Sequence, residues 1–319
     1  MFGMPVVLFL EHEAFSPEAL TKLSAAFNVV YCDIDNLDKI VGKNNVVGIF
    51  VRLRSYIDDT VFNHLPNLKF VISPTTGHNH LDLEAMRRRA IRVVSLKGET
   101  VFLDSVTATA ELTWGLILSL TRRIPQALNH VASGGWNRDA FRGVDLSGKT
   151  LGIVGYGRLG RIIEDYARAF RMNVLINDIA PRDPVFGKAV ALDHLLTESD
   201  IVTVHVDINP SSVNMFGDAQ FRNMKRSAYF INTSRGELID EDALIRALKK
   251  GSIAAAATDV IRDEQTGRAN SPLINACAAL QGRLLVTPHI AGASWDSMSK
   301  TEDFIISKVL NEWSNDANL

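Results

Sequence analysis

The sequence predicts an α/β protein with two parallel sheets, and two observations lead to this fold class. Short apolar runs alternate along most of the chain with stretches whose apolar residues recur at helical spacing, which is typical of parallel strands joined by crossover helices. The alternation forms two separate arrays, and 319 residues exceed what one hydrophobic core usually organises. We therefore expect two domains.

The first array fills the N-terminal third of the chain. Ser16 and Pro17 are residue types preferred at an N-cap and a first helical position, so a helix is predicted from there to Phe27. Asp82 is the expected start of another helix, which ends in the arginine run 87–89. The expected strands are Val6–Leu10, Val29–Tyr31, Val46–Val51, Leu68–Ile72 and Ile91–Val94.

The second array begins near Thr150. A helix over Asp240–Lys250 is predicted by its acidic start, by two lysines in its last turn and by Gly251 as a stop. The helical stretches Val106–Arg123 and Trp295–Trp313 flank the array, and we predict that they connect the domains and that the second returns to the first domain. The six expected strands are Leu151–Val154, Val174–Asn177, Ile201–Val204, Ala228–Asn232, Ala254–Thr258 and Leu284–Thr287.

Composition narrows the possible functions. The chain has 34 basic and 36 acidic side chains, hence a net charge of −2, and this balance argues against a nucleic-acid partner. The longest apolar tract, Leu112–Leu120, is far shorter than the roughly 20 residues of a membrane span. Cys32 and Cys277 supply neither a disulfide framework nor a paired-cysteine metal site. The start of the chain resembles a strand rather than a signal peptide. With so few cysteines and so short an apolar tract, we expect a cytoplasmic protein without a membrane partner, and we expect no metal.

A glycine motif opens the second array. Gly155, Gly157 and Gly160 match Gly-x-Gly-x-x-Gly, with Tyr156, Arg158 and Leu159 between them. The motif follows an apolar strand and opens a segment with helical periodicity, the setting in which such glycines form a tight turn and bring a pyrophosphate to the amides of a helix N-terminus. The alternative is a glycine-rich strand-to-helix turn without a ligand.

An acidic residue supports the dinucleotide interpretation. Asp178 follows the next expected strand, where a carboxylate accepts hydrogen bonds from the adenosine ribose hydroxyls. The same carboxylate would repel a 2′-phosphate, so NAD is favoured over NADP. Arg182 would partly offset that repulsion, which leaves NADP as an alternative.

Three stretches of the chain carry a family resemblance. Residues 146–160, Ile231-Asn-Thr-Ser-Arg-Gly-Glu-Leu-Ile-Asp240 and Val286-Thr-Pro-His-Ile-Ala-Gly-Ala-Ser294 resemble, in this order, signature stretches of the D-isomer-specific 2-hydroxyacid dehydrogenases. The resemblance implies a Rossmann doubly wound domain inserted into a discontinuous flavodoxin-like α/β catalytic domain, with the active site in the cleft. We expect the catalytic domain to comprise residues 1–101 and 291–319, and the NAD-binding domain residues 102–290. A homodimer formed largely through the nucleotide-binding domains is also implied.

The resemblance assigns roles to individual residues. It implies that the enzyme interconverts a 2-oxo acid and its D-2-hydroxy acid by hydride transfer with NAD(H). Arg235 resembles the arginine that binds the substrate carboxylate, and His289 resembles the acid/base. Glu264 stands where the family places the carboxylate that pairs with this histidine. Cofactor contacts are implied for His205, Thr233, Ser234, Asp259 and His289, and substrate contacts for the backbone of Thr76 and Gly77.

Each of these residues has a plainer alternative when taken alone. Arg235 would also suit a solvated strand end, His289 a structural site, and His205 the end of a strand. His78, His80 and Asp82 suggest a metal site, but no further ligand stands at an evident spacing. Two other functions stay open from the sequence: a dinucleotide-sensing binding protein like the corepressors that share this fold, and a formate- or phosphite-type dehydrogenase.

Overall fold

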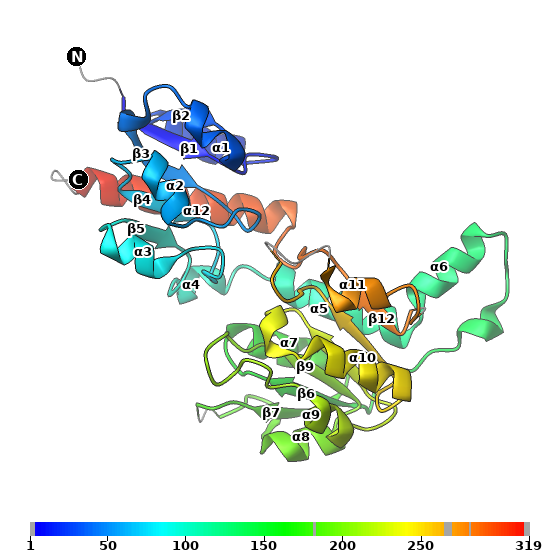
Figure 1. Cartoon of the computed structure of the whole chain (residues 1–319). Coiled ribbons are helices and arrows are strands. Elements are labelled where there is room, and N and C mark those ends of the chain that lie inside the picture. The colour runs from blue at the N-terminus through cyan, green and yellow to red at the C-terminus, as the bar shows by residue number, and fades with distance from the viewer. Residues whose placement is uncertain (1–3, 181–182, 265–269, 281, 316–319) are drawn as a thin grey trace. The chain divides into compact units, whose positions relative to one another are not determined.

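The chain divides into two compact units. The computed structural model describes residues 4–180, 183–264, 270–280 and 282–315. The first unit combines Met1–Val106 with Ser294–Leu319, and the second comprises Thr107–Ala293 (Figure 1). The division falls a few residues after each of the boundaries expected from the sequence.

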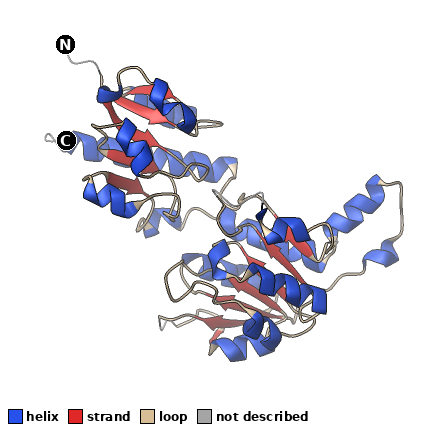
Figure 2. Ribbon diagram, viewed as in Figure 1, coloured by secondary structure: helices blue, strands red, loops and turns tan. Residues whose placement is uncertain are grey.

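The first unit is built on a five-stranded parallel sheet in the order β2-β1-β3-β4-β5 (Figure 2). This is the flavodoxin-like order. Its strands are β1 (Val6–Phe9), β2 (Asn28–Tyr31), β3 (Val46–Phe50), β4 (Phe70–Ser73) and β5 (Arg92–Ser95). Its helices are α1 (Pro17–Ser24), α2 (Asp59–His64), α3 (Leu83–Arg88), α4 (Thr100–Leu103) and α12 (Trp295–Asn315), with short 3-10 turns at Ile34–Lys39 and Lys43–Asn45.

Helix starts in this unit follow the sequence signals. Ser16 caps α1 by accepting the Ala19 N–H at 3.3 Å, and Asp82 caps α3 by accepting the Ala85 N–H at 2.9 Å. The helix predicted to reach Phe27 ends at Ser24. The C-terminal helix α12 packs on α1, β4 and β5, and the buried Ile305, Ile306 and Val309 join the core on that face of the sheet.

The second unit holds a seven-stranded parallel sheet in the order β12-β11-β10-β9-β6-β7-β8. Its strands are β6 (Thr150–Val154), β7 (Asn173–Asn177), β8 (Lys188–Ala189), β9 (Ile201–Val204), β10 (Tyr229–Asn232), β11 (Ala255–Thr258) and β12 (Leu284–Val286). Its helices are α5 (Ala108–Thr121), α6 (Ile124–Ala132), α7 (Arg158–Ala169), α8 (Leu192–Glu198), α9 (Asp218–Asn223), α10 (Glu241–Lys250) and α11 (Pro272–Ala276), with 3-10 turns at Arg138–Phe141 and Gly236–Leu238.

The strand order of the second unit is that of a doubly wound dinucleotide-binding sheet with one further strand. The chain reverses direction across the sheet between β6 and β9, and ligands of such sheets bind at this switch point, beyond the carboxyl ends of the strands. The predicted fold class is confirmed, as is the helix that begins after Asp240 and ends at Gly251. The expectation of six strands was wrong, because the sheet has a seventh strand, β8. This strand consists of two residues, and both are exposed.

Helix α5 is a core helix. By length and composition, Thr100–Thr121 is apolar enough to cross a membrane. In the structure, however, α5 packs on β10, β11 and α7, and buries Trp114, Ile117 and Leu120 in the core of the second unit. The apolar composition of α5 is thus explained by burial within the sheet-and-helix layers.

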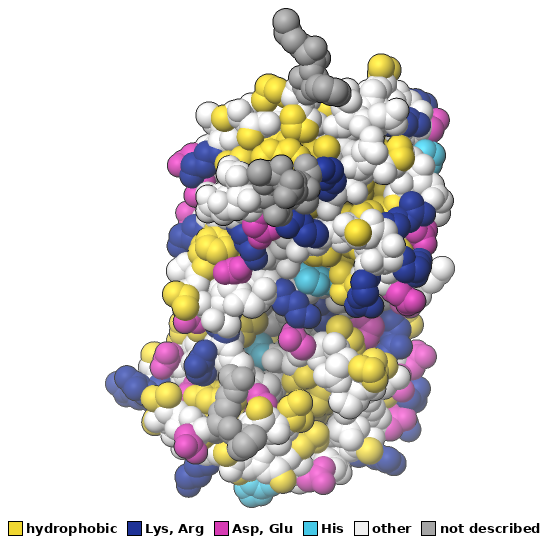
Figure 3. Space-filling model, turned by 90° about the vertical axis from the view of Figure 1, so that its left-hand side faces the viewer, with side chains coloured by type: hydrophobic (Ala, Val, Ile, Leu, Met, Phe, Trp, Pro, Cys, Tyr) yellow, Lys and Arg dark blue, Asp and Glu magenta, His cyan; other side chains and the backbone are white. Residues whose placement is uncertain are grey.

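Charges of both signs are mixed on the surface. On the face drawn in Figure 3, lysine and arginine side chains lie among aspartate and glutamate side chains. The arginines that end α3 illustrate this mixing, because Arg88 and Arg89 each bond to the Asp59 carboxylate at 2.6 Å. Such exposed pairs contribute at most about 1 kcal/mol each.

Candidate functional site

The candidate residues of the second unit follow strands that end together. Asn232, Thr258 and Val286 are register partners on β10, β11 and β12, and Val204, Val154 and Asn177 continue the same edge of the sheet. Directly after these strand ends come His289, Asp259, Thr233 to Arg235, His205, Gly155 and Asp178. The register therefore places all of them along one carboxyl edge, which the sequence alone only suggested.

The glycine turn between β6 and α7 needs glycine for two different reasons. Gly155 has a φ of +95°, and a Cβ there would collide with the His205 carbonyl oxygen. At Gly160, in the first turn of α7, a Cβ would collide with the Gly155 carbonyl oxygen. The first and third glycines thus allow the close packing of strand, turn and helix.

The space beside the turn fits a dinucleotide. A Cβ on Gly157 would meet no atom within 4 Å. Gly157 is also the N-cap of α7, and no side chain caps the helix there, so its N-terminal amides stay available to an anion. Arg158 and Leu159 form the first turn, half-buried, and Leu159 packs against the core.

Asp178 lies next to the glycine turn. One carboxylate oxygen accepts the Tyr156 N–H at 2.6 Å and the other accepts the Ala180 N–H at 2.8 Å. An ionised carboxylate can accept about four hydrogen bonds, so capacity for two ribose hydroxyls is left. Arg182, considered as a partner of a 2′-phosphate, lies outside the described residues.

Three further candidates line the middle of the edge. The Thr233 hydroxyl bonds to the Thr113 hydroxyl of α5 at 2.8 Å, and the Ser234 hydroxyl donates to the Val204 carbonyl at 2.7 Å. His205 Nε2 bonds to the Thr203 hydroxyl at 3.0 Å, whereas its buried Nδ1 has no hydrogen-bond partner within the described residues. An orphaned buried nitrogen at this edge fits a site that receives a polar ligand. The cofactor contacts of these three residues stay predictions.

We predict that His205 makes the folded protein sensitive to acid. Burial lowers its pKa to about 4, whereas the unfolded value is about 6.5. Between these values the unfolded chain binds a proton that the folded chain does not, so stability present above pH 6.5 is lost as the pH falls toward 4. Between pH 7 and pH 5 this group should cost about 2 kcal/mol.

Urea unfolding of the wild type and of His205→Gln at both pH values checks this prediction. The variant should lose less stability on acidification by about the same 2 kcal/mol. An equal loss in both proteins would show that other groups carry the acid sensitivity.

Arg235 begins the segment after β10. Its side chain is half-buried, and one guanidinium nitrogen donates to the Ser234 carbonyl at 2.6 Å. Asn232 helps to fix this segment, because its side-chain amide donates to the Arg235 carbonyl at 2.9 Å. The remaining donors of the planar guanidinium suit a carboxylate.

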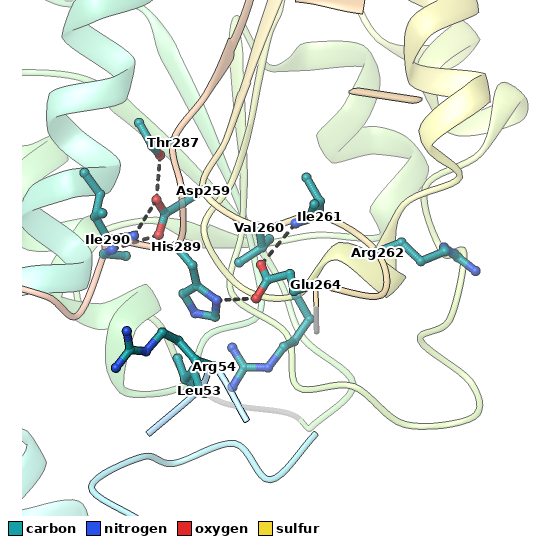
Figure 4. Close-up of polar contacts among 12 residues, drawn as sticks. Leu53, Arg54, Asp259, Val260, Ile261, Arg262, Glu264, Thr287, His289 and Ile290 are labelled. Atoms are coloured by element: carbon teal, nitrogen blue, oxygen red, sulfur yellow. Dashed lines mark hydrogen bonds and ion pairs between the residues drawn. The ribbon is translucent and has the colours of Figure 1, made fainter. Parts of the chain in front are cut away.

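His289 and Glu264 form a hydrogen-bonded pair although 25 residues separate them. His289 Nδ1 lies 2.6 Å from Glu264 Oε2, and Figure 4 shows the imidazole turned toward the carboxylate. Because a carboxylate only accepts, Nδ1 carries the proton and Nε2 is left for chemistry. The other carboxylate oxygen accepts the Ile261 N–H at 3.2 Å, and the two side chains are 23% and 20% exposed. A partly exposed histidine oriented by a carboxylate has the geometry of a general acid/base.

Asp259 holds the turn that carries His289. Its fully buried carboxylate accepts the Thr287 hydroxyl at 2.5 Å and the backbone N–H groups of Ile290 and Ala291 at 2.9 and 2.7 Å. Desolvation raises the pKa of Asp259, and these hydrogen bonds oppose that rise. Its expected cofactor contact stays a prediction, whereas its bonds to Thr287 and Ile290 are drawn in Figure 4.

The backbone of His289 is left-handed, with a φ of +53°. Few residues other than glycine adopt this region, and they persist there only where surrounding bonds enforce it. Here the His289 N–H donates to the Asp259 carbonyl at 2.9 Å. The strained backbone thus turns the imidazole toward Glu264.

In the first unit, hydrogen bonds fix the loop after β4. Ser73 bonds to the Thr75 hydroxyl at 2.9 Å and to His80 Nε2 at 3.0 Å, and Thr75 donates to the Gly77 carbonyl at 2.9 Å. His78 Nε2 lies 2.8 Å from the Ser95 hydroxyl. Across the described part of the chain, no three metal-binding side chains come together. The assignment of Thr76 and Gly77 to the substrate carboxylate stays a prediction.

Sequence reasoning missed the buried Glu164 of α7. Its carboxylate bonds to the Tyr156 hydroxyl and to the backbone of Phe186 and Gly187. The only signal was an acid on the apolar side of a helix, between Ile163 and Ala167. The helical period alone did not separate it from a solvated position.

Comparison with known proteins agrees with this geometry. Residues 114–291 match the family model described as D-isomer specific 2-hydroxyacid dehydrogenase, NAD binding domain. A glycerate dehydrogenase of Methylorubrum extorquens is 38% identical over 251 residues, which is 77% of this chain and 76% of that protein. A glyoxylate reductase of Aeropyrum pernix is 32% identical over 307 residues, covering 90% of this chain and 87% of that protein.

Solved structures are similar over almost the whole chain. The TT0316 protein of Thermus thermophilus superposes with a TM-score of 0.83 at 29% identity, covering 97% of both chains. The family match spans more than half of the chain, and it includes the glycine turn, Arg235, Glu264 and His289. The chain therefore belongs to the D-isomer specific 2-hydroxyacid dehydrogenase family and is an NAD-dependent oxidoreductase.

Proposed function

We propose that this enzyme reduces a small 2-oxo acid to its D-2-hydroxy acid, and catalyses the reverse oxidation, with Arg235, Glu264 and His289 as its catalytic residues. The observation that carries the proposal is the 2.6 Å bond between His289 and Glu264 at the sheet edge that also holds the glycine turn. A proton donor oriented by a carboxylate beside a dinucleotide site has the parts that carbonyl reduction requires.

In this mechanism each side chain has one task. When NADH is bound, its chemistry would be to supply a hydride for the carbonyl carbon of the substrate. The Arg235 guanidinium holds the substrate carboxylate with parallel hydrogen bonds and so orients the carbonyl. Protonated His289 gives the Nε2 proton to the carbonyl oxygen, while Glu264 stabilises the imidazolium through Nδ1. In the oxidation, neutral His289 takes the hydroxyl proton at the same nitrogen.

The cofactor would lie along the carboxyl edge of the sheet. Asp178 would accept the adenosine ribose hydroxyls, and the turn from Gly155 to Gly160 would bind the pyrophosphate through its amides. His205, Thr233, Ser234 and Asp259 would border the nicotinamide half. The carboxylate of Asp178 beside this turn supports NAD over NADP, because a 2′-phosphate there would meet a like charge.

The names of the relatives suggest the size of the substrate. One is a glycerate dehydrogenase and the other a glyoxylate reductase, so hydroxypyruvate and glyoxylate are the first substrates to test. The test follows NADH absorbance with these acids, pyruvate and longer 2-oxo acids, and determines the configuration of the product. Turnover giving the D-hydroxy acid supports the proposal. Absence of turnover with every 2-oxo acid, with NAD reduction by formate or phosphite instead, would contradict it.

We also propose that two copies associate through the segment around α6. Figure 1 shows α6 extending away from the sheet of the second unit, and no residue of this helix is buried. Ile124, Leu128 and Val131 share one face of α6 at helical spacing and are 41%, 65% and 51% exposed. Trp136, which follows α6, is 91% exposed. A second copy presenting the same apolar stripe would cover it, as self-complementary dimer interfaces do.

Leu128→Asp is expected to dissociate this dimer. A charge at the centre of an apolar contact should raise the dissociation constant at least about 100-fold. Light scattering after gel filtration should give twice 35.1 kDa for the wild type and 35.1 kDa for the variant. Val101→Asp, at an 88% exposed valine of α4 in the first unit, is the matched control and should stay dimeric. A monomeric wild type would contradict the proposal.

A further inference from the structure

We propose that Tyr156 and Glu164 are positioning residues for the adenosine half of NAD, because together they hold residues 185–187 against the glycine turn. The inference rests on the proposed placement of the adenosine beside Asp178. It adds a task for a tyrosine hydroxyl and a buried glutamate that the mechanism above does not use.

The Glu164 carboxylate bonds to the segment before β8. The side chain is 1% exposed in the second turn of α7. Oε1 accepts the backbone N–H groups of Phe186 and Gly187 at 2.9 and 2.6 Å, and Oε2 accepts the Tyr156 hydroxyl. A buried carboxylate is costly unless donors surround it, and these three donors satisfy it. The position of residues 186 and 187 is therefore tied to the helix that follows the glycine turn.

Tyr156 links the same segment to the turn itself. Its side chain is 1% exposed, and its hydroxyl accepts the Val185 N–H at 3.2 Å while donating to Glu164. Its backbone N–H donates to the Asp178 carboxylate at 2.6 Å. One residue of the glycine motif thus contacts both the ribose-binding acid and the segment that returns to the sheet.

Residues 185–187 are anchored to the sheet at Gly187 and carry apolar side chains. Gly187 packs so closely on β7 that a Cβ would lie 2.9 Å from the Val174 carbonyl oxygen, and β8 then pairs with β7. Val185 and Phe186 of the segment are 75% and 48% exposed, and Ile179, which follows Asp178, is 96% exposed. Exposed apolar groups next to a ribose-binding acid suit the planar face of adenine. Without the Tyr156 and Glu164 bonds, three consecutive N–H groups of this stretch would lose their partners.

The test compares binding of NADH with binding of reduced nicotinamide mononucleotide, which lacks the adenosine half. Tyr156→Phe should raise the dissociation constant for NADH about tenfold, because it removes the hydroxyl that bonds to the Glu164 carboxylate and to the Val185 N–H. The KM for NADH should rise by a similar factor, whereas the dissociation constant for the mononucleotide should change by less than about twofold. Binding is measured directly by fluorescence titration, so the result does not depend on turnover.

Matched variants distinguish a role in positioning the adenosine half of NAD from an effect on the stability of the folded protein. Glu164→Ala should weaken NADH binding at least as much as Tyr156→Phe, whereas Glu164→Gln should largely restore it, because the amide oxygen still accepts the two N–H groups. Tyr166→Phe, on the same helix but packed on Trp114, should bind NADH normally. A lower melting temperature with unchanged NADH binding, or an equal loss with both nucleotides, would overturn the inference. A wild type that binds NADH yet reduces no 2-oxo acid would contradict the proposed function alone.

Discussion

Replacing His289 with alanine is expected to lower kcat for 2-oxo acid reduction by about 10²–10⁴-fold. The imidazole is the proton donor of the proposed mechanism, and the 2.6 Å bond to Glu264 orients it. Glu264→Gln should cause a smaller loss, because an amide oxygen still accepts the Nδ1 proton but no longer carries the charge that stabilises the imidazolium. Steady-state kinetics with saturating NADH and a 2-oxo acid measures both variants.

Two control measurements accompany this prediction. NADH binding to both variants should stay within about threefold of the wild type, because the proposed pyrophosphate and ribose contacts lie elsewhere on the sheet edge. His194→Ala, at an exposed histidine of α8, is the control and should keep full activity. Wild-type turnover in His289→Ala would remove the histidine from the mechanism.

Arg235→Gln is expected to lower kcat/KM for the 2-oxo acid by about 10²–10⁴-fold, since two charge-assisted hydrogen bonds of roughly 1.5–3 kcal/mol each would be lost. Arg235→Lys keeps the positive charge but not the planar fork, so we expect an intermediate loss of about 10–10²-fold. The ratio of the two variants measures how much of the effect is geometry rather than charge.

The control for this prediction is another arginine of the second unit. Arg246 pairs with Asp218 at 2.8 Å on the surface, and Arg246→Gln should change kcat/KM by less than about twofold. NADH binding should be unchanged in both Arg235 variants. A loss confined to NADH binding would instead assign Arg235 to the cofactor.

The sequence predicted the parts of the fold that depend on local signals. Apolar runs located the long strands, and Ser16 and Asp82 marked helix starts through bonds to nearby amides. β8 was missed because Lys188 and Ala189 are exposed, and only pairing with β7 makes them a strand. The apolar face of α6 also escaped prediction, since its residues have the periodicity of a buried helix without being buried.

In the candidate site, too, the sequence indicated individual residues better than it indicated the contacts between them. The family resemblance implied that Glu264 pairs with His289, and the structure shows the two side chains in contact. The residues by themselves did not show this, because the contact depends on two strand ends and a left-handed backbone. The bonds that Asp259 makes to the turn of residues 287–291 were not foreseen either. Such long-range polar contacts have no local sequence period.

The place of α12 has a consequence for synthesis on the ribosome. Its side chains complete the core against α1, β4 and β5, and the Glu302 carboxylate accepts the Ser16 N–H at 2.8 Å. Domains generally fold as units once their residues have emerged. The strands of the second unit all precede α12 in the chain, whereas the first unit cannot complete its core until residues 295–315 have been translated. Until then that face of the first unit's sheet lacks the apolar cover of Ile305, Ile306 and Val309.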